Sequence, residues 1–466
     1  MKAEAANQSL PSLTPALATW VQRRLHASYR LSAGFTWWWR RRFTKAGFLV
    51  FLGIIATGLM GADTNLSLAY QAFVFLCLLF IAALAGTQFS RTHVEAERVL
   101  PRFGSAGLPV SYRVTLTNLT DKPQRGLSVT EDLADPRPTL AQFVSTPEPG
   151  EEKRNWVDRR FYRWRWLLKQ NLRGRVSEVP CPALPPRGSA DVQLQLLPLH
   201  RGVVRLDAVA VACPDAFGLF RTFVCVPLPQ SLLILPKRYF VPPLALPGQL
   251  KYQQGGVALA ASVGESEEFV SLRDYRPGDA LRHIHWPSWA KTGRPIVKEF
   301  QDEFFTRHAL ILDTFLRVAG SDVFEEAVSV AASLACTVQA QESLLDLMFV
   351  GPQAFCFTMG RGVGHLEQLL EILASVQPCR DREFNSLLQL VTQHAGDLSG
   401  CLCVFVEWDE ARREFVRHLR ELGVPLMVLV VTEAGAPKLA PGPMAAEPER
   451  FRQLEVGKVA EELANL

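Results

Sequence analysis

Two long apolar runs near the N-terminus dominate the pattern of hydrophobic and polar positions. Ala46–Ala62 and Leu66–Gly86 contain no charged residue. At 1.5 Å per residue they reach about 26 and 32 Å, enough for a bilayer core of about 30 Å. The pattern predicts two transmembrane helices within residues 46–90, joined by a tight turn at Asp63–Asn65. A buried helical hairpin of a soluble protein is the alternative.

The charges beside these runs predict an orientation. The charged residues of the leader, residues 1–45, are all basic except Glu4. Arg91 and Arg98 follow the second run. Basic flanks remain in the cytoplasm, so we expect a multi-pass protein of a bacterial inner membrane with its soluble domains in the cytoplasm. Trp37–Trp39 fit an interfacial aromatic belt, and residues 1–35 read as poorly ordered or weakly helical.

Residues 91–236 alternate with a period of two. Val110, Tyr112, Val114 and Leu116 face one way and the polar residues between them the other, and 192–196 repeat the pattern. Short strands separated by turn residues predict an antiparallel β-sandwich.

Lys153–Arg175 is a basic and aromatic stretch inside this segment. In an extended chain, Tyr162, Trp164 and Trp166 would lie on one side and Arg163 and Arg165 on the other. Three interpretations stay open: a hairpin whose tryptophans pack on the sandwich, contact with an anionic leaflet, or nucleic-acid binding. Nucleic acid is the weakest of these, and the net charge of +4 does not favour it.

Residues 304–432 alternate between apolar strands and amphipathic helices. Strands are expected at His308–Asp313, Leu344–Val350, Cys401–Val406 and Leu426–Val431, and helices at 323–341, 364–376 and 409–421. This order predicts a doubly wound, parallel α/β domain with ligand-binding positions at the strand ends, where Asp313 lies. Residues 433–466 read as a loose tail with a last short helix.

Between these domains, residues 237–303 carry a dense charged motif that is most concentrated over 264–303. We expect it to form a fixed network of charge-assisted hydrogen bonds. The candidate partner-binding or interdomain residues are Glu268, Arg273, Asp274, Tyr275, Gly278, Asp279, Arg282, His285, Trp286, Lys298 and Glu299. As an interdomain clamp the motif is structural, and as a docking face it binds a partner; the two roles are compatible.

Catalysis by the same motif is the competing hypothesis. Asp274 and Asp279 could serve as acid and base, but neighbouring arginines would hold both ionised. His283 and His285 have no third metal ligand at a suitable spacing. The chain contains no P-loop motif, and its nine cysteines form no CxxC pair, which suits a reducing compartment. No cofactor is expected.

The run SEEFVSLRDYRPGDALRHIHWPSWAK, with VKEFQDE and LILD after it and CPDAFGLFR before it, resembles bacterial domain-of-unknown-function family 58. The resemblance covers about residues 91–431. Its pattern falls on most of the candidate residues above and also on Phe269, Leu272, Ile284 and Ala290.

The resemblance implies a membrane-anchored β-sandwich joined to a von Willebrand factor A-like α/β domain. It also implies a MoxR-type AAA+ ATPase as partner, and no established enzymatic activity. The run Asp313-Thr314-Phe315-Leu316-Arg317 lacks both serines of the metal motif of factor A-like domains, so Asp313 is only a weak candidate metal ligand.

The sequence therefore favours a non-enzymatic adaptor or scaffold in the assembly or maturation of other proteins. It would contact a lipid bilayer and an AAA+ ATPase, and a homo-oligomer is possible. An enzyme using residues 264–303 and a ligand-binding module at the α/β strand ends are the alternatives.

Overall fold

The computed structural model describes residues 15–60, 67–89, 93–243, 268–277, 279, 281–301, 307–316, 321–340, 344–359 and 363–466 of the 466-residue chain. The chain forms two compact units, Met1–Ile234 and Leu235–Leu466. Each unit is described here by itself.

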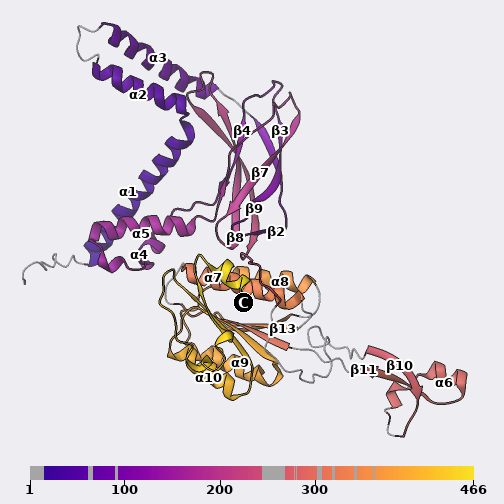
Figure 1. Ribbon diagram of the computed structural model, residues 1–466. Helices are drawn as coiled ribbons and strands as arrows, with labels where there is room; N and C mark the ends of the chain where they lie inside the picture. The colour runs from indigo at the N-terminus through magenta and orange to yellow at the C-terminus, as the bar shows by residue number, and fades with distance from the viewer. Residues whose placement is uncertain are drawn as a thin grey trace, which may run out of the picture. The chain divides into compact units, whose positions relative to one another are not determined.

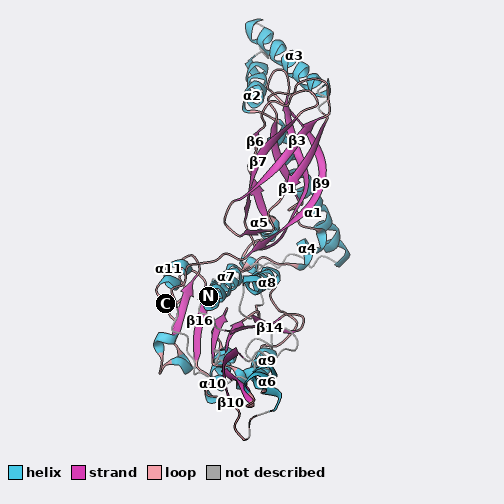
Figure 2. Ribbon diagram, turned by 90° about the vertical axis from the view of Figure 1, so that its right-hand side faces the viewer, coloured by secondary structure: helices cyan, strands magenta, loops and turns pink. Residues whose placement is uncertain are grey.

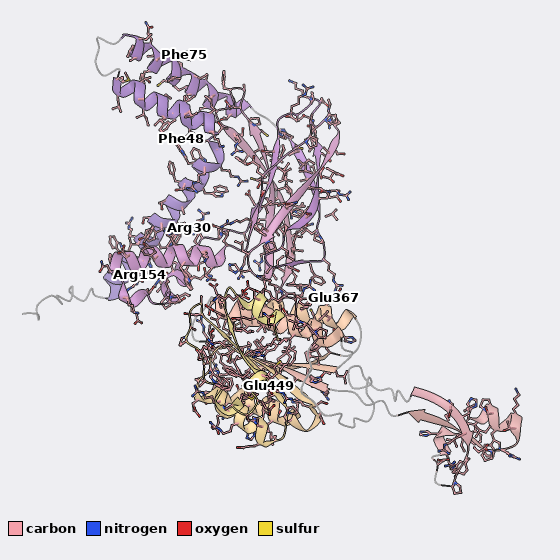
Figure 3. The ribbon with its side chains drawn as sticks, in the orientation of Figure 1. Arg30, Phe48, Phe75, Arg154, Glu367 and Glu449 are labelled. Carbon is pink, nitrogen blue, oxygen red and sulfur yellow. The ribbon has the colours of Figure 1, made fainter. Side chains whose placement is uncertain are left out.

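The first unit begins with three helices, α1 (Pro15–Arg42), α2 (Lys45–Met60) and α3 (Ser67–Phe89). Helices α2 and α3 lie side by side (Figures 1 and 2), and glycines of α2 allow the close approach. A Cβ atom on Gly53 would lie 3.3 Å from Leu76, and one on Gly58 would lie 3.2 Å from Phe73. Phe48 on α2 and Phe75 on α3 are exposed (Figure 3), as are many other apolar side chains of the pair.

Among the described helices, Leu68–Thr87 of α3 is long and apolar enough to cross a membrane, and little of it is covered by protein. Helix α2 is equally apolar, but its 16 residues reach only about 24 Å at 1.5 Å per residue. The structure therefore supports one candidate span and does not confirm the expected pair. The turn at Asp63–Asn65 lies outside the described residues.

Helix α2 starts inside the hydrogen-bonding network of the sandwich. The Thr44 hydroxyl donates to the Gly218 carbonyl oxygen at 2.6 Å, and the Thr44 amide donates to Leu219 at 3.2 Å. Gly47 passes so close to the Leu219 carbonyl that a Cβ atom there would clash with backbone. The base of α2 is thus fixed to the turn between the last two long strands.

Of the two expectations for residues 1–35, poor order is wrong and helix is correct for the part that the structure describes. Residues 15–42 form one continuous helix of 28 residues, α1. Its buried His26 lies 3.0 Å, through Nε2, from the Pro138 carbonyl oxygen, and Tyr29 packs against Phe143 and Trp164. Tertiary contacts of aromatic residues therefore stabilise a helix whose sequence shows little amphipathic pattern.

Two antiparallel sheets form the predicted sandwich, with strand orders β1-β3-β7-β5 and β2-β9-β8-β4-β6. The strands are β1 (Val94–Val99), β2 (Phe103–Ser105), β3 (Val110–Asn118), β4 (Ser128–Leu133), β5 (Gly174–Val176), β6 (Val179–Pro180), β7 (Ser189–Pro198), β8 (Gly202–Pro214) and β9 (Arg221–Leu235). Strand β3 pairs with β7 in the register Val110↔Leu196 to Thr117↔Ser189. The alternating apolar residues of both strands are buried, as their period of two predicts.

The basic stretch 153–175 is not an extended hairpin. It forms helix α5 (Trp156–Asn171), which packs with α4 (Leu140–Ser145) and α1. Trp164 is buried against Phe143 instead of the sandwich. The alternating sequence YRWRW mimics a strand, but the buried positions Arg163, Trp164 and Leu167 follow helical spacing.

The second unit contains a six-stranded sheet with the order β14-β13-β12-β15-β16-β17. Its strands are β12 (Arg307–Leu312), β13 (Leu344–Val350), β14 (Ala354–Met359), β15 (Gly400–Phe405), β16 (Leu426–Thr432) and β17 (Phe451–Glu455). Only the β13–β14 pairing in this sheet is antiparallel. Helices α7 (Asp322–Ala340) and α8 (Val363–Ser375) cover one face, and α9 (Asn385–His394) and α10 (Glu410–Glu421) the other (Figure 1). This is the predicted doubly wound arrangement.

The prediction of a loose tail after residue 432 is wrong, whereas the last short helix expected there is present. Residues 451–455 add strand β17 in parallel to β16, from Val428↔Phe451 to Thr432↔Glu455. Helix α11 (Val459–Ala464) then packs on β17, and Leu454, Val459 and Leu463 are buried. The C-terminal residues therefore complete the sheet.

Candidate functional site

The charged motif folds around a two-stranded sheet. Strands β10 (Glu268–Asp274) and β11 (Ile296–Gln301) pair antiparallel, with a bulge between Phe269 and Ser271. The single turn η2 (Leu281–His283) and helix α6 (Trp286–Thr292) connect them. We call residues 268–301 the hairpin module.

Backbone hydrogen bonds close the hairpin module over two buried side chains. The Tyr275 amide donates to the Pro295 carbonyl oxygen and the His285 amide to Ile296, both at 2.9 Å. Ile284 forms a bridge with Val297, and both side chains are buried. Among the described side chains of the module these two are the buried aliphatic ones, and the polar contacts described next add to this packing.

The structure describes only part of the predicted set. Gly278 lies outside the described residues, as do the side chains of Glu268, Arg282 and Glu299. Lys298 pairs with Leu272 across the two strands, and Asp274 is exposed at the end of β10.

Arg273 and Asp279 form the central contact of the module. The guanidinium donates from Nη1 and Nη2 to the two carboxylate oxygens at 2.7 and 2.8 Å, and the Arg276 amide donates to Oδ2 at 2.8 Å. The hydrogen bonds from Arg273, with that from the Arg276 amide, lower the pKa of Asp279 to about 2. An acid this strong holds no proton at neutral pH, so Asp279 is suited to a structural bridge and not to general acid catalysis.

A histidine and a serine form the start of α6. Nδ1 of His285 lies 2.6 Å from Oγ of Ser288, three residues further on. This side-chain contact joins the N-cap residue of α6 to its first turn, and His285 makes no side-chain hydrogen bond to the described backbone of the helix. Trp286 and Trp289 stack beside this pair with their ring centroids 5.2 Å apart.

The hairpin module presents large apolar side chains to solvent. Leu272, Leu281 and Trp286 are 41, 69 and 62% exposed. Exposed apolar groups beside an arginine held in an ion pair have the composition of a protein-binding surface. Leu281 is absent from the predicted set, because a single leucine between charged residues gives no periodic signal.

The second candidate position is the switch point of the large sheet, where the chain leaves β12 for β13 on one side and later returns to β15 on the other. Asp313 lies at this edge and is completely buried. Arg412 of α10 donates to Asp313 from Nε at 3.0 Å and from Nη2 at 3.3 Å. The amides of Phe315 and Val406 donate to the same carboxylate.

These donors engage both oxygens of Asp313. Burial raises the pKa of the Asp313 carboxyl, and the charge and hydrogen bonds of Arg412 counteract that effect. Arg412 also donates to the Phe315 carbonyl oxygen at 3.1 Å and lies 4.4 Å from the Phe384 ring centroid. A guanidinium therefore occupies the place where a cation would bind, and no metal-binding cluster of His, Cys, Asp or Glu occurs in the described ranges.

Part of this chain is similar to a known protein family. Residues 271–420 match the family Protein of unknown function DUF58. The match starts in β10 and ends in α10, so it includes residues 271–301 of the hairpin module and the Asp313–Arg412 pair. It confirms the resemblance over this part of the chain.

One curated relative is the Uncharacterized protein YeaD of Bacillus subtilis (strain 168), which is 27% identical over 188 residues. The alignment covers 40% of this chain and 46% of YeaD, so the chain matches about half of that relative's length. Neither name states an activity.

Among solved structures, a GH20 exo-β-N-acetylglucosaminidase from Vibrio harveyi aligns with 9% identity and a TM-score of 0.15. The alignment covers 77% of this chain and 60% of the enzyme. A score this low carries no argument about fold or activity.

Proposed function

We propose that this chain is a membrane-anchored, non-enzymatic adaptor whose hairpin module binds a protein partner. Helix α3, with α2 beside it as a second span, holds the protein in a bacterial inner membrane with its soluble parts in the cytoplasm. The observation that carries the proposal is the exposure of Leu272, Leu281 and Trp286 on a module fixed by the Arg273–Asp279 pair.

The electrostatics of the module favour binding over chemistry. Asp279 is committed to two guanidinium hydrogen bonds and is ionised at neutral pH. Ordered arginine and tryptophan side chains are common among the residues that contribute most to protein interfaces.

The partner in this proposal is a MoxR-type AAA+ ATPase, and the α/β domain is von Willebrand factor A-like. Both come from the family resemblance in the motif. The process served would be assembly or maturation of other proteins, and the adaptor could act as a homo-oligomer.

Affinity capture tests the proposal. The full chain is solubilised in detergent, immobilised and exposed to host extract with and without ATP, and bound proteins are identified by mass spectrometry. We expect an AAA+ ATPase to be captured, and its affinity to fall about thirtyfold in Trp286→Ala, since a central interface tryptophan contributes about 2 kcal/mol.

Lys291→Ala is the matched control, because Lys291 is exposed on the same short helix. We expect capture by this variant to equal wild type. Failure to capture any AAA+ protein in either nucleotide state contradicts the proposed identity of the partner. An equal loss of affinity in Trp286→Ala and Lys291→Ala contradicts the proposed binding surface.

An enzyme remains the second candidate, because His285 and Ser288 lie within hydrogen-bonding distance and could form a base and nucleophile. Ser288→Ala separates the two functions. The adaptor predicts unchanged capture by this variant, whereas hydrolysis of an acyl substrate by wild type and not by Ser288→Ala would support the enzyme.

A further inference from the structure

A cavity of about 260 Å³ lies in the first unit where the end of α1, the start of α2, the C-terminal end of α3 and the start of β9 meet. Its wall is almost entirely apolar and includes six aromatic side chains, Trp38, Trp39, Phe43, Phe51, Phe80 and Phe220. These rings support one another: Trp39 stacks on Phe43 with centroids 3.8 Å apart, and Phe220 meets Phe43 and Phe80 edge-on at 4.9 Å. These ring contacts hold the aromatic wall of the cavity in place.

The lining of this cavity also includes arginine side chains. Arg42 and Arg221 both line it. Arg42 forms no ion pair within the described part of the chain and lies 5.4 Å from the Trp38 ring centroid. Arg221 uses Nη1 to bind Glu178, but its Nε is buried and has no hydrogen-bond acceptor among the described residues.

Arg41 adds a third guanidinium nearby. It lies 4.3 Å from the Phe223 ring centroid, and Arg221 lies 5.9 Å from the same ring. Nη1 of Arg41 binds Asp132, whereas its Nη2 is buried and without an acceptor in the described structure. Buried donors without acceptors are costly, so an anion that reached them would bind favourably.

The position of the cavity along α3 identifies the ligand class. The candidate span Leu68–Thr87 ends here, and its residues Leu84 and Thr87 line the cavity. The end of a span lies at the depth where acyl chains meet headgroups, a level that tryptophan and arginine also favour. A molecule with an apolar chain for the aromatic wall and a phosphate for the arginines matches both halves of the site.

We propose that this cavity binds one anionic phospholipid, with part of an acyl chain between the aromatic rings and the headgroup phosphate at Arg42 and Arg221. The inference rests on the membrane anchoring in the proposed function and adds a specific lipid site to it.

Native mass spectrometry of the full chain tests the site. The protein is reconstituted in bilayers of equal phosphatidylglycerol and phosphatidylcholine and then stripped of bulk lipid with detergent. We expect one phosphatidylglycerol to remain bound. Its retention relative to phosphatidylcholine should fall about tenfold or more in Arg42→Gln, which loses a charge-assisted hydrogen bond.

Two further variants separate charge from cavity. Arg40→Gln removes the same charge from an exposed residue of α1 that does not line the cavity, and retention should equal wild type. Leu84→Trp fills the cavity and keeps every arginine, and retention should fall to the level of Arg42→Gln. Equal retention of the two lipids by wild type, or full retention by Leu84→Trp, overturns the proposal.

Competition and flotation distinguish the remaining outcomes. Free glycerol 3-phosphate should not displace the retained lipid, and complete displacement would mean a simple anion site and overturn the lipid assignment. Flotation with liposomes reports on anchoring itself. A protein that floats without selective lipid retention contradicts only this inference, whereas a protein that does not float contradicts the anchoring as well.

Discussion

Arg412 places its guanidinium against both carboxylate oxygens of Asp313 at the switch point of the α/β sheet, with the two residues 99 positions apart in the chain. In doubly wound sheets this position is the usual place for a ligand. Here a side chain of the protein fills it. The sheet edge therefore contributes to stability in this chain, and the hairpin module remains the better candidate for binding a partner.

Arg412→Met should destabilise the α/β unit by about 3–5 kcal/mol, because it leaves the buried Asp313 carboxylate without its counter-charge. Denaturant unfolding followed by tryptophan fluorescence measures the loss. The double variant Asp313→Asn with Arg412→Met should recover part of it, since no buried charge remains. Arg417→Gln, whose partners Glu410 and Glu414 are exposed, should leave the midpoint unchanged. If Mg²⁺ stabilised the wild-type protein, the interpretation of this pair as a closed structural contact would be wrong.

Trp164→Ala should cost about 3–5 kcal/mol, because Trp164 fills the space between α1, α4 and α5. Trp156→Ala, on an exposed position of the same helix, should cost about 0.5 kcal/mol or less. The unfolding midpoint of the detergent-solubilised protein compares them. Equal effects would contradict the helical packing and favour the extended hairpin that the alternating sequence suggests.

Leu454→Ala should destabilise the second unit by about 2–5 kcal/mol, because Leu454 is buried on strand β17. Its neighbour Arg452 is exposed on the same strand, and Arg452→Ala should have little effect. Thermal unfolding of both variants distinguishes an integral strand from a tail. Indifference to both substitutions would show that residues 451–455 do not complete the sheet.

The carboxyl group of Asp279 should titrate near pH 2. Carbon-13 NMR of protein labelled at aspartate, assigned with Asp279→Asn, measures the midpoint directly. The Arg273–Asp279 pair stabilises the module above the ordinary aspartate pKa of about 4 and loses that contribution as the pH falls through the folded value. Arg273→Gln should move the midpoint upward toward the ordinary value. A wild-type midpoint near 4 would show that the pair does not form in solution.

Regular patterns were sufficient to predict much of this fold. The alternation from Val110 to Leu116 identifies a strand with one buried face, and the structure confirms it. The apolar runs of the α/β domain likewise correspond to β12, β13, β15 and β16, because parallel strands covered by helices on both faces are apolar throughout.

The errors arise where local pattern and tertiary environment disagree. Alternating aromatic and basic residues around Trp164 read as a strand, yet contacts with α1 and α4 make this segment a helix. Strand β17 has only five residues, of which Phe451 and Leu454 alone are buried, so its pattern is too short to recognise. The Asp313–Arg412 pair joins the end of strand β12 to helix α10, 99 residues later in the chain. No pattern in the sequence near either residue indicates this contact.

In the candidate site, too, some features follow from the sequence and others depend on the tertiary structure. The density of charged residues predicts a network of charge-assisted hydrogen bonds, and the described residues show one ion pair of it, Arg273–Asp279. The exposure of Leu281 could not be predicted, because it depends on how the single turn η2 projects from the hairpin module.

Thr44 and Gly47 join the base of α2 directly to the turn at Gly218 and Leu219, without an intervening flexible linker. If α2 and α3 lie in a bilayer, as we propose, a change in the tilt of α2 would reach the sandwich directly through these contacts. Under the proposed anchoring, a bilayer of different thickness that changed this tilt would therefore reorient the sandwich, and the first unit would act as a lever as well as a tether.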